Sequence, residues 1–266
     1  MTTHPPAPLQ WRHLISPPLD GAANMAWDLA LMARARRTGQ AVLRIYAWRS
    51  PTISLGRNQT ARGAYDLARA ASRGVTFVRR PTGGRALLHY HEVTYSVTAP
   101  EAFDPSLRGA YTRINAILLD ALTRLGVRAE LAGARMHTPS PGLSPCFAQP
   151  SQGEIVADGH KLVGSAQWRQ DGALLQHGSI LMEDDQQLIG DLLATPNPVP
   201  TPPAATLASL LGAEPRFDAV ANALVDALRA AVPETQPLHP ATDAVLSRAV
   251  ERETTTFVDD TWTWRR

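Results

Sequence analysis

Helical and strand-like patterns of apolar residues alternate along the first two thirds of the chain. Apolar side chains recur every three or four positions over 24–37 and 107–125, and a glycine closely follows each stretch, which predicts two helices, the first of them amphipathic. A shorter helix is expected over 65–72. Between them, apolar runs bounded by turn residues predict strands over 42–48, 52–55, 75–78, 86–89 and 93–98.

The clearest local pattern is a set of three apolar runs joined by Asp-Gly dipeptides. Such dipeptides favour tight hairpin turns because both positions tolerate a positive φ. The pattern therefore predicts three consecutive antiparallel strands. The strands are 154–156, 161–168 and 173–181, and the turns are Asp158-Gly159 and Asp171-Gly172.

The organisation of the chain changes after residue 195. Five prolines fall within the nine positions 195–203, which cannot continue a helix or a central strand, and we assign 196–203 to a linker. Residues 1–195 form the main domain, and 204–266 form a small helical part with helices over 206–211, 217–231 and 242–252. Strands interspersed with a few helices indicate an α+β fold, with mixed and antiparallel sheets flanked by helices.

Composition excludes several classes of protein. The chain has 266 residues, 44% of them apolar and 19% charged, values near globular averages that argue against disorder and coiled coil. The formal charge, 26 − 24 = +2, is too balanced to indicate nucleic-acid binding. No stretch reaches the ~20 apolar residues of a membrane span, and residues 1–18 lack the apolar core of a secretory signal, so we expect a cytoplasmic protein.

Two residue types occur only once. Lys161 is the single lysine beside 25 arginines, and a compact ammonium that survives where arginine has otherwise replaced lysine suggests a chemical role. A leftover surface lysine is the simple alternative. Cys146 is the only cysteine, which excludes an internal disulfide, and most free cysteines are inert buried residues.

Several catalytic motifs do not occur. A Walker-type phosphate loop needs Ser or Thr after its lysine, whereas Leu162 follows Lys161. No Cys/His set has zinc-ligand spacing, and the pair His89 and His91 is expected to be incidental, so we predict no metal. There is also no Gly-x-Ser-x-Gly nucleophile elbow.

A glycine pair flanked by arginines joins two of the predicted strands, in the run 79–85 (RRPTGGR). Glycines let a backbone come close to a ligand where side chains would collide. The amides of this run would suit a carboxyl, thioester or phosphate group. On its own, the pair is also compatible with a simple turn.

Two longer blocks resemble the lipoate and biotin protein ligase superfamily, specifically its octanoyltransferase branch. The first block is 79–89 (RRPTGGRALLH) with 92–97 (EVTYSV). The second comprises 145–147 (PCF), 158–167 (DGHKLVGSAQ) and 175–180 (LQHGSI). The resemblance covers roughly 20–193 and weakens beyond Pro196.

This resemblance implies a class II ligase-like catalytic domain over 1–195 and an acyltransferase that needs no cofactor. In such enzymes an octanoyl group arrives as a thioester on acyl carrier protein, moves to a cysteine, and passes to a lysine of a lipoyl domain, commonly glycine cleavage protein H. Cys146 and Lys161 match the catalytic positions, and we expect a monomer. The matching substrate-binding positions are Arg79, Arg80, Thr82, Gly83, Gly84, Arg85, His89, Gly164, Ser165, Ala166 and His177.

The chemistry fits these residue types. A thiolate both attacks and leaves readily, and a nearby ammonium favours it over the thiol. Lys161 and the amides of Gly83 and Gly84 are expected to stabilise the oxyanion. The acyl chain needs an apolar tunnel, for which the candidates are Leu43, Leu55, Leu87 and Val163.

The sequence departs from the family pattern at two positions. Tyr90-His91 stands where an acidic residue usually follows the histidine, with Glu92 after it, and Leu29 replaces an acidic residue after Asp28. The first departure leaves open how His89 is hydrogen-bonded.

Three alternatives remain. An ATP-dependent lipoate-protein ligase has a similar glycine loop and lysine motif but needs no thiol, which Cys146 argues against. A related amidotransferase moves octanoyl between two lipoyl domains and also uses a cysteine. The third alternative is a non-enzymatic acceptor in which Lys161 is itself lipoylated. Carrier domains are much smaller than this chain, however, and hold their lysine at a turn, whereas Lys161 lies inside a predicted strand.

Overall fold

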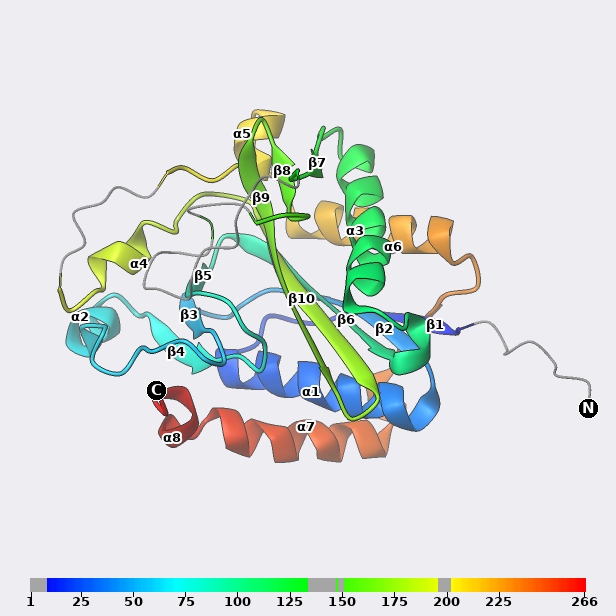
Figure 1. Cartoon of the computed structure of the whole chain (residues 1–266), viewed down its shortest axis with the longest axis horizontal. Coiled ribbons are helices and arrows are strands. Elements are labelled where there is room, and N and C mark those ends of the chain that lie inside the picture. Colours follow the sequence, from blue (N-terminus) through cyan, green and yellow to red (C-terminus); the bar gives the residue numbers. More distant parts are fainter. Residues whose placement is uncertain (1–8, 134–146, 148–150, 196–201) are drawn as a thin grey trace, which may run out of the picture.

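Two sheets form the centre of the molecule, and helices cover them on both sides (Figure 1). The computed structural model describes residues 9–133, 147, 151–195 and 202–266. The strands are β1 (Trp11–Ile15), β2 (Ala41–Tyr46), β3 (Thr52–Leu55), β4 (Thr76–Arg79), β5 (Leu87–His89), β6 (Glu92–Pro100), β7 (Glu130–Leu131), β8 (Ile155–Ala157), β9 (His160–Gln170), β10 (Ala173–Leu181) and β11 (Gln236–Pro237). The helices are α1 (Gly21–Thr38), α2 (Leu67–Ser72), α3 (Leu107–Arg124), α4 (Leu188–Asp191), α5 (Leu207–Leu211), α6 (Phe217–Ala231), α7 (Ala244–Phe257) and α8 (Asp260–Thr263), with 3₁₀ turns at Glu101–Phe103 and Pro240–Thr242.

Both sheets mix parallel and antiparallel pairs, so the α+β prediction is confirmed. The large sheet has the order β11-β1-β2-β6-β10-β9-β8-β7, and its strands from β2 onward pair antiparallel. In the small sheet, β3 pairs parallel with β4 and antiparallel with β5. The segment between β4 and β5 is the glycine-rich run, which connects the two edge strands of the small sheet past the C-terminal end of β3.

The two predicted Asp-Gly hairpins are confirmed. Asp158 and Gly159 have φ of 49° and 75°, and Asp171 and Gly172 have φ of 50° and 78°. Positive φ at both central residues is the geometry that matches the twist of a two-residue hairpin. These turns set the register of β8, β9 and β10, and thereby place Lys161 at the start of β9.

The main core lies between one face of the large sheet and the helix pair α3 and α6. Ile114 and Leu118 of α3 and Leu224 of α6 are almost fully buried there against Leu43 and Val97 of the sheet. Burying each such side chain contributes about 1.5–3 kcal/mol. This layer makes the large sheet a rigid wall for the site on its other side.

The amphipathic interpretation of the first helix is wrong. Only Arg36 and Arg37 of helix α1 are exposed, and the helix buries Asn24, Asp28 and Arg34 as well as most of its apolar residues. The reason is that α1 is covered twice: one side packs on the strands, and α7 packs along the other. Its buried polar residues are therefore held in hydrogen bonds instead of facing water.

The C-terminal part contributes to the same cores as the main domain. Helix α6 packs on α3, α7 packs on α1, and β11 adds a strand beside β1. Residues 196–201 of the predicted linker lie outside the described residues, and the division at 196–203 stays a prediction. In the described part of the chain, no helix has the length and apolar character that crossing a bilayer requires.

Candidate functional site

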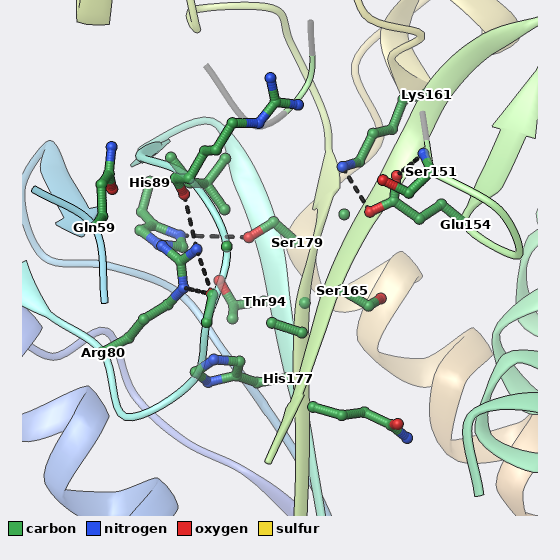
Figure 2. Close-up of a pocket in the computed structure, with 18 of the residues that line it drawn as sticks. Gln59, Arg80, His89, Thr94, Ser151, Glu154, Lys161, Ser165, His177 and Ser179 are labelled. Carbon is green, nitrogen blue, oxygen red and sulfur yellow. Dashed lines mark hydrogen bonds and ion pairs between the residues drawn. The ribbon is translucent and has the colours of Figure 1, made fainter. Parts of the chain in front are cut away.

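A cavity of about 540 Å³ lies where the two sheets meet. Figure 2 shows Lys161 and Glu154 on one side of it and Arg80 and His89 on the other. The walls come from the glycine-rich run, from β5, β6, β9 and β10, and from α1 and β2. Residues from both sequence blocks therefore meet around one space.

Arg80 organises the glycine-rich run. Its guanidinium donates to the carbonyl oxygens of Gly83 at 2.8 Å, Arg85 at 2.7 Å and Ser54 at 2.9 Å. The side chain is 5% exposed and lines the cavity. Arg80 thus holds the loop through its carbonyl oxygens and not through its amide groups.

Gly56 is needed for the same loop to come close to β3. A Cβ atom at Gly56 would lie 1.9 Å from the carbonyl oxygen of Gly84, which itself has φ of +98°. No side chain is tolerated at such a contact, and L-residues rarely adopt that φ. By contrast, a Cβ atom at Gly83 would meet nothing within 4 Å, so Gly83 faces open space.

His177 ties the loop to α1 through a buried chain of hydrogen bonds. Its Nδ1 lies 2.9 Å from Oδ2 of Asp28, and its Nε2 lies 2.6 Å from Oγ1 of Thr82. Because a carboxylate only accepts, Nδ1 carries a proton, and Nε2 shares the second hydrogen bond with the Thr82 hydroxyl. The chain positions Thr82 directly before the two glycines.

Asp28 is the fixed end of that chain. It is fully buried and also accepts from Arg44 and from the hydroxyl of Tyr46, both at 3.2 Å. Burial works to raise the pKa of Asp28, but the hydrogen bond from His177 and the charges of His177 and Arg44 outweigh it, and the pKa lies below its usual value. The carboxylate is therefore charged at neutral pH.

Glu92 is the acidic partner of His89, although Tyr90-His91 stands where the family usually has an acidic residue. Its carboxylate lies 2.7 Å from Nδ1 of His89 and accepts from Ser179 at 2.8 Å, while Nε2 of His89 lies 2.7 Å from Oγ of Ser54. The His89 ring also stacks on Trp48, with centroids 3.9 Å apart. His89 is thus held on every side as part of the cavity wall.

Lys161 lies buried with its charge balanced. Its Nζ donates to Oε1 of Glu154 at 2.8 Å, and the two side chains are 1% and 9% exposed. The other oxygen of Glu154 accepts from the amide of Ser151 at 2.7 Å. The carboxylate therefore fixes the position of the ammonium in the cavity wall.

The residue after the lone cysteine packs on this lysine. Cys146 lies outside the described residues, whereas Phe147 is described and buried, with its ring centre 5.0 Å from Nζ of Lys161. A Cβ atom at Gly164 would come within 3.1 Å of both Lys161 Cε and Phe147 Cζ. The glycine of the lysine motif thus makes room for the aromatic ring against the lysine.

Ten of the predicted site residues line the cavity, and two do not. Thr82 is buried and contacts His177, which does line the cavity. Arg79 is also buried, and it donates to the carbonyl oxygens of Gly56, Gln59 and Thr263. Burial and the charges of neighbouring arginines lower the pKa of Arg79 to about 10. The ten lining residues are Arg80, Gly83, Gly84, Arg85, His89, Lys161, Gly164, Ser165, Ala166 and His177.

Most of the residues expected for an acyl tunnel lie elsewhere. Leu87 lines the cavity, but Leu43 and Val163 belong to the core under α3, and Leu55 belongs to the core of the small sheet. The apolar wall of the cavity instead includes Met25, Tyr46, Trp48 and Leu87. The prediction was wrong because successive residues of a strand point to opposite faces, and Leu43, Leu55 and Val163 point into the cores and not into the cavity.

Sequence reasoning also missed Glu154 as a site residue. The sequence pattern marks it only as the first position of a strand, although an acidic residue shortly before the hairpin that carries the single lysine is a usable signal. Among the described residues, no group of three His, Cys, Asp or Glu side chains is arranged to hold a metal ion. His91 in particular has 41% of its side chain exposed, while His89 is buried.

Comparison with known proteins identifies relatives over most of the chain. The model of the lipoyl protein ligase A/B catalytic domain matches residues 20–229. Octanoyltransferase LipM of Kyrpidia tusciae is 42% identical over 196 residues, which are 70% of this chain and 71% of that protein. Octanoyltransferase LipM of Brevibacillus brevis is 40% identical over 198 residues, 71% of each protein.

Solved structures share the fold at lower identity. A bipartite lipoate protein ligase from Thermoplasma acidophilum superposes with a TM-score of 0.77 at 18% identity, covering 96% of both chains. A lipoate-protein ligase A bound with ATP gives a TM-score of 0.77 at 19% identity, covering 96% of this chain and 99% of that one. The chain belongs to the lipoyl protein ligase A/B catalytic domain family and, within it, to the LipM octanoyltransferases.

Proposed function

We propose that this octanoyltransferase takes an octanoyl group from octanoyl-acyl carrier protein onto Cys146 and passes it to a lysine of a lipoyl domain, such as glycine cleavage protein H. The observation that carries the proposal is the buried Lys161, which lines the cavity opposite the glycine-rich run and packs on Phe147, the residue bonded to Cys146. The one lysine lines the cavity, and the neighbour of the one cysteine packs on that lysine.

The reaction has two steps. The thiolate of Cys146 attacks the carbonyl carbon of the donor thioester, the C–S bond to the carrier breaks, and the carrier thiolate leaves and takes up a proton. The lysine amine of the lipoyl domain then attacks the acyl-enzyme, the Cys146 thiolate leaves, and the nitrogen loses a proton to give the amide. The first step exchanges one thioester for another and needs no ATP, and the second is downhill.

Lys161 serves the reaction as a positioned hydrogen-bond donor. Its ammonium carries three N–H groups, one of which goes to Glu154. An ion pair at 2.8 Å acts on its surroundings as a dipole more than as a full charge, so we assign Lys161 to the oxyanion and give it a smaller part in forming the thiolate. Losing one oxyanion donor typically costs about 10²–10³ in kcat.

The glycine-rich run supplies the rest of the oxyanion site. Gly83 and Gly84 line the same cavity as Lys161, and Arg80 and the Asp28–His177–Thr82 chain hold their backbone from behind. Amides that are fixed before the reaction stabilise developing charge without reorganisation. We assign this task to the backbone amides, with Thr82 and His177 as positioning residues.

The apolar wall of the cavity suits the acyl chain. Met25, Trp48 and Leu87 offer carbon surface, and each methylene buried there contributes about 0.8 kcal/mol. We propose that the chain works as a cytoplasmic monomer without a cofactor or metal, and that 1–195 forms the catalytic domain. Transfer of the octanoyl group between two lipoyl domains is the alternative.

Intact-mass spectrometry tests the proposal. Mixing the enzyme with octanoyl-acyl carrier protein in the absence of nucleotide should add one octanoyl group, and Cys146→Ala should abolish this adduct. An octanoyl-lipoyl domain in place of the carrier as donor tests the amidotransferase alternative. Acylation of a lipoyl domain that needs ATP and releases pyrophosphate would replace the proposal by a ligase.

A further inference from the structure

Four arginines gather where the C-terminal segment meets the loop after β3, and we call them the arginine platform: Arg57, Arg62, Arg265 and Arg266. Nη2 of Arg265 donates to the carbonyl oxygen of Arg57 at 2.6 Å, and the amide of Arg62 donates to a backbone oxygen of Arg266 at 2.8 Å. Arg62 and Arg266 are exposed, and Arg57 and Arg265 are half-buried. The C-terminus lies near α8 and β4 in Figure 1.

The platform adjoins the cavity through the glycine-rich run. The amide of Arg57 donates to the carbonyl oxygen of Thr82 at 2.7 Å, and the next residue, Asn58, lines the cavity and is exposed. A partner seated on these arginines would therefore lie beside the mouth of the site.

Tryptophan rings hold two of the arginines in place. The guanidinium carbon of Arg57 lies 4.8 Å from the centre of the Trp168 ring, and that of Arg265 lies 4.0 Å from the centre of the Trp262 ring. Such contacts contribute about 0.5–1 kcal/mol at exposed sites and orient the charged group. The positive charge is thus presented by a fixed surface.

No side-chain carboxylate is bound to the platform within the described part of the protein. No ion pair there joins a carboxylate to any of the four arginines, while the exposed arginines Arg49, Arg69 and Arg73 each have one. Asp259, nearby, caps α8 through Thr261 instead. Burial and the charges of Arg57 and Arg266 lower the pKa of Arg265, a sign of like charges held together.

We propose that the arginine platform is the docking surface for the acidic carrier protein that delivers the octanoyl group, an inference that rests on the proposed function. Carboxylates on the carrier would relieve the repulsion among the arginines and steer the donor to the mouth of the cavity. The donor fits this surface better than the acceptor does, because the acceptor brings a cationic lysine toward the site, whereas the arm of the donor carries a phosphodiester.

Three octanoyl thioesters separate the possible contacts: octanoyl-acyl carrier protein, octanoyl-phosphopantetheine and the uncharged octanoyl-pantetheine. For Arg62→Glu/Arg266→Glu, the apparent KM for the carrier-bound donor should rise about 10-fold or more, with little change in the rate at saturation. Self-acylation by octanoyl-pantetheine should stay at the wild-type rate. Arg216→Glu/Arg229→Glu, at the N-cap and in the last turn of α6, carries the same change in charge and should leave all three donors unaffected.

Each other outcome overturns the proposal. An unchanged KM for the carrier, or an equal loss with all three donors, would remove the platform from donor docking. A loss of equal size with octanoyl-phosphopantetheine would assign the arginines to the phosphate alone. Slower transfer from pre-acylated enzyme to the lipoyl domain, with normal acylation, would assign them to the acceptor. If no thioester acylates wild-type Cys146, the proposed function itself fails.

Discussion

At the scale of single residues, the site depends on how one buried cation is held. Lys161 has 1% of its side chain exposed, and Glu154 is the carboxylate that it contacts. Breaking such a pair by removing one charge typically costs about 3–5 kcal/mol, because the remaining charge stays buried. Substitution of Lys161 is therefore expected to affect the chemical step directly, whereas substitution of Glu154 is expected to affect the position of Lys161.

Lys161→Arg should slow octanoyl transfer by about 10²-fold or more while the protein stays folded. Arginine keeps the positive charge and can still bond Glu154, but its planar group is larger, and Gly164 and Phe147 already crowd the lysine stem. Single-turnover rates of lipoyl-domain octanoylation measure the effect. Turnover at the wild-type rate would refute the view that this lysine was retained for its chemistry.

Glu154→Gln should lower the rate about 10-fold or more and the free energy of unfolding by about 3 kcal/mol, since the amide accepts a hydrogen bond but does not balance the ammonium. Glu154→Asp keeps the charge and should recover part of the rate. The readouts are the split between kcat and KM and urea unfolding. If Glu154→Gln lost stability but kept its kcat, Glu154 would have no role in positioning Lys161.

At the scale of elements, the glycine-rich run and β3 must approach each other backbone to backbone. Gly56→Ala would place a methyl group 1.9 Å from the Gly84 carbonyl, so we expect a loss of about 1–3 kcal/mol in stability and a displaced loop with impaired acylation. Gly190→Ala in α4 is the matched control, because a Cβ atom there meets nothing within 4 Å. Thermal melting and acylation assays compare the two. Equal behaviour of both variants would contradict the close approach.

The elements that could be predicted from sequence are those with local causes. The β8–β10 hairpins follow from their Asp-Gly turns, and α3 follows from its apolar period and its terminal glycine. Strands β1 and β11 could not be predicted in this way: β11 has two residues and exists only because it pairs with β1. Helix α1 was assigned the wrong character because α7, which covers its outer side, is contributed from far along the chain.

The site was predicted where the residues themselves are unusual. Lys161 stood out as the single lysine, and Gly83 and Gly84 as a pair, but only the resemblance to the octanoyltransferase branch assigned them to one site. Glu154 and the apolar wall that includes Met25 and Trp48 were missed, since their positions depend on which faces of strands and helices meet at the cavity. Whether Cys146 faces this cavity stays a prediction.

At the scale of the whole molecule, Asp28 links α1, β2 and β10 through one buried charge. Because its pKa in the folded protein lies below the ordinary 3.8, the carboxylate stabilises the fold above that pH, and this contribution is lost as the pH falls through the lowered value. Asp28→Asn also leaves Arg44 buried without its carboxylate. We expect a loss of about 3–5 kcal/mol at pH 7.

The pH dependence of unfolding tests this linkage. Denaturant unfolding of wild type and Asp28→Asn from pH 7 downward should show a gap in free energy that narrows once the pH falls below 3.8. Asp226→Asn on α6, an exposed carboxylate, serves as the control and should change stability little at any pH. A gap of constant size across the range would contradict a charged Asp28 as the source of stability.

The most direct test of the account is a pulse–chase experiment followed by intact-mass spectrometry. Enzyme exposed to octanoyl-acyl carrier protein without nucleotide, then freed of donor and mixed with a lipoyl domain, should first gain one octanoyl group on Cys146. It should then lose that group as the lipoyl domain gains it on lysine. An acylated lipoyl domain formed without any adduct on Cys146, or an adduct that cannot be chased, would contradict the account.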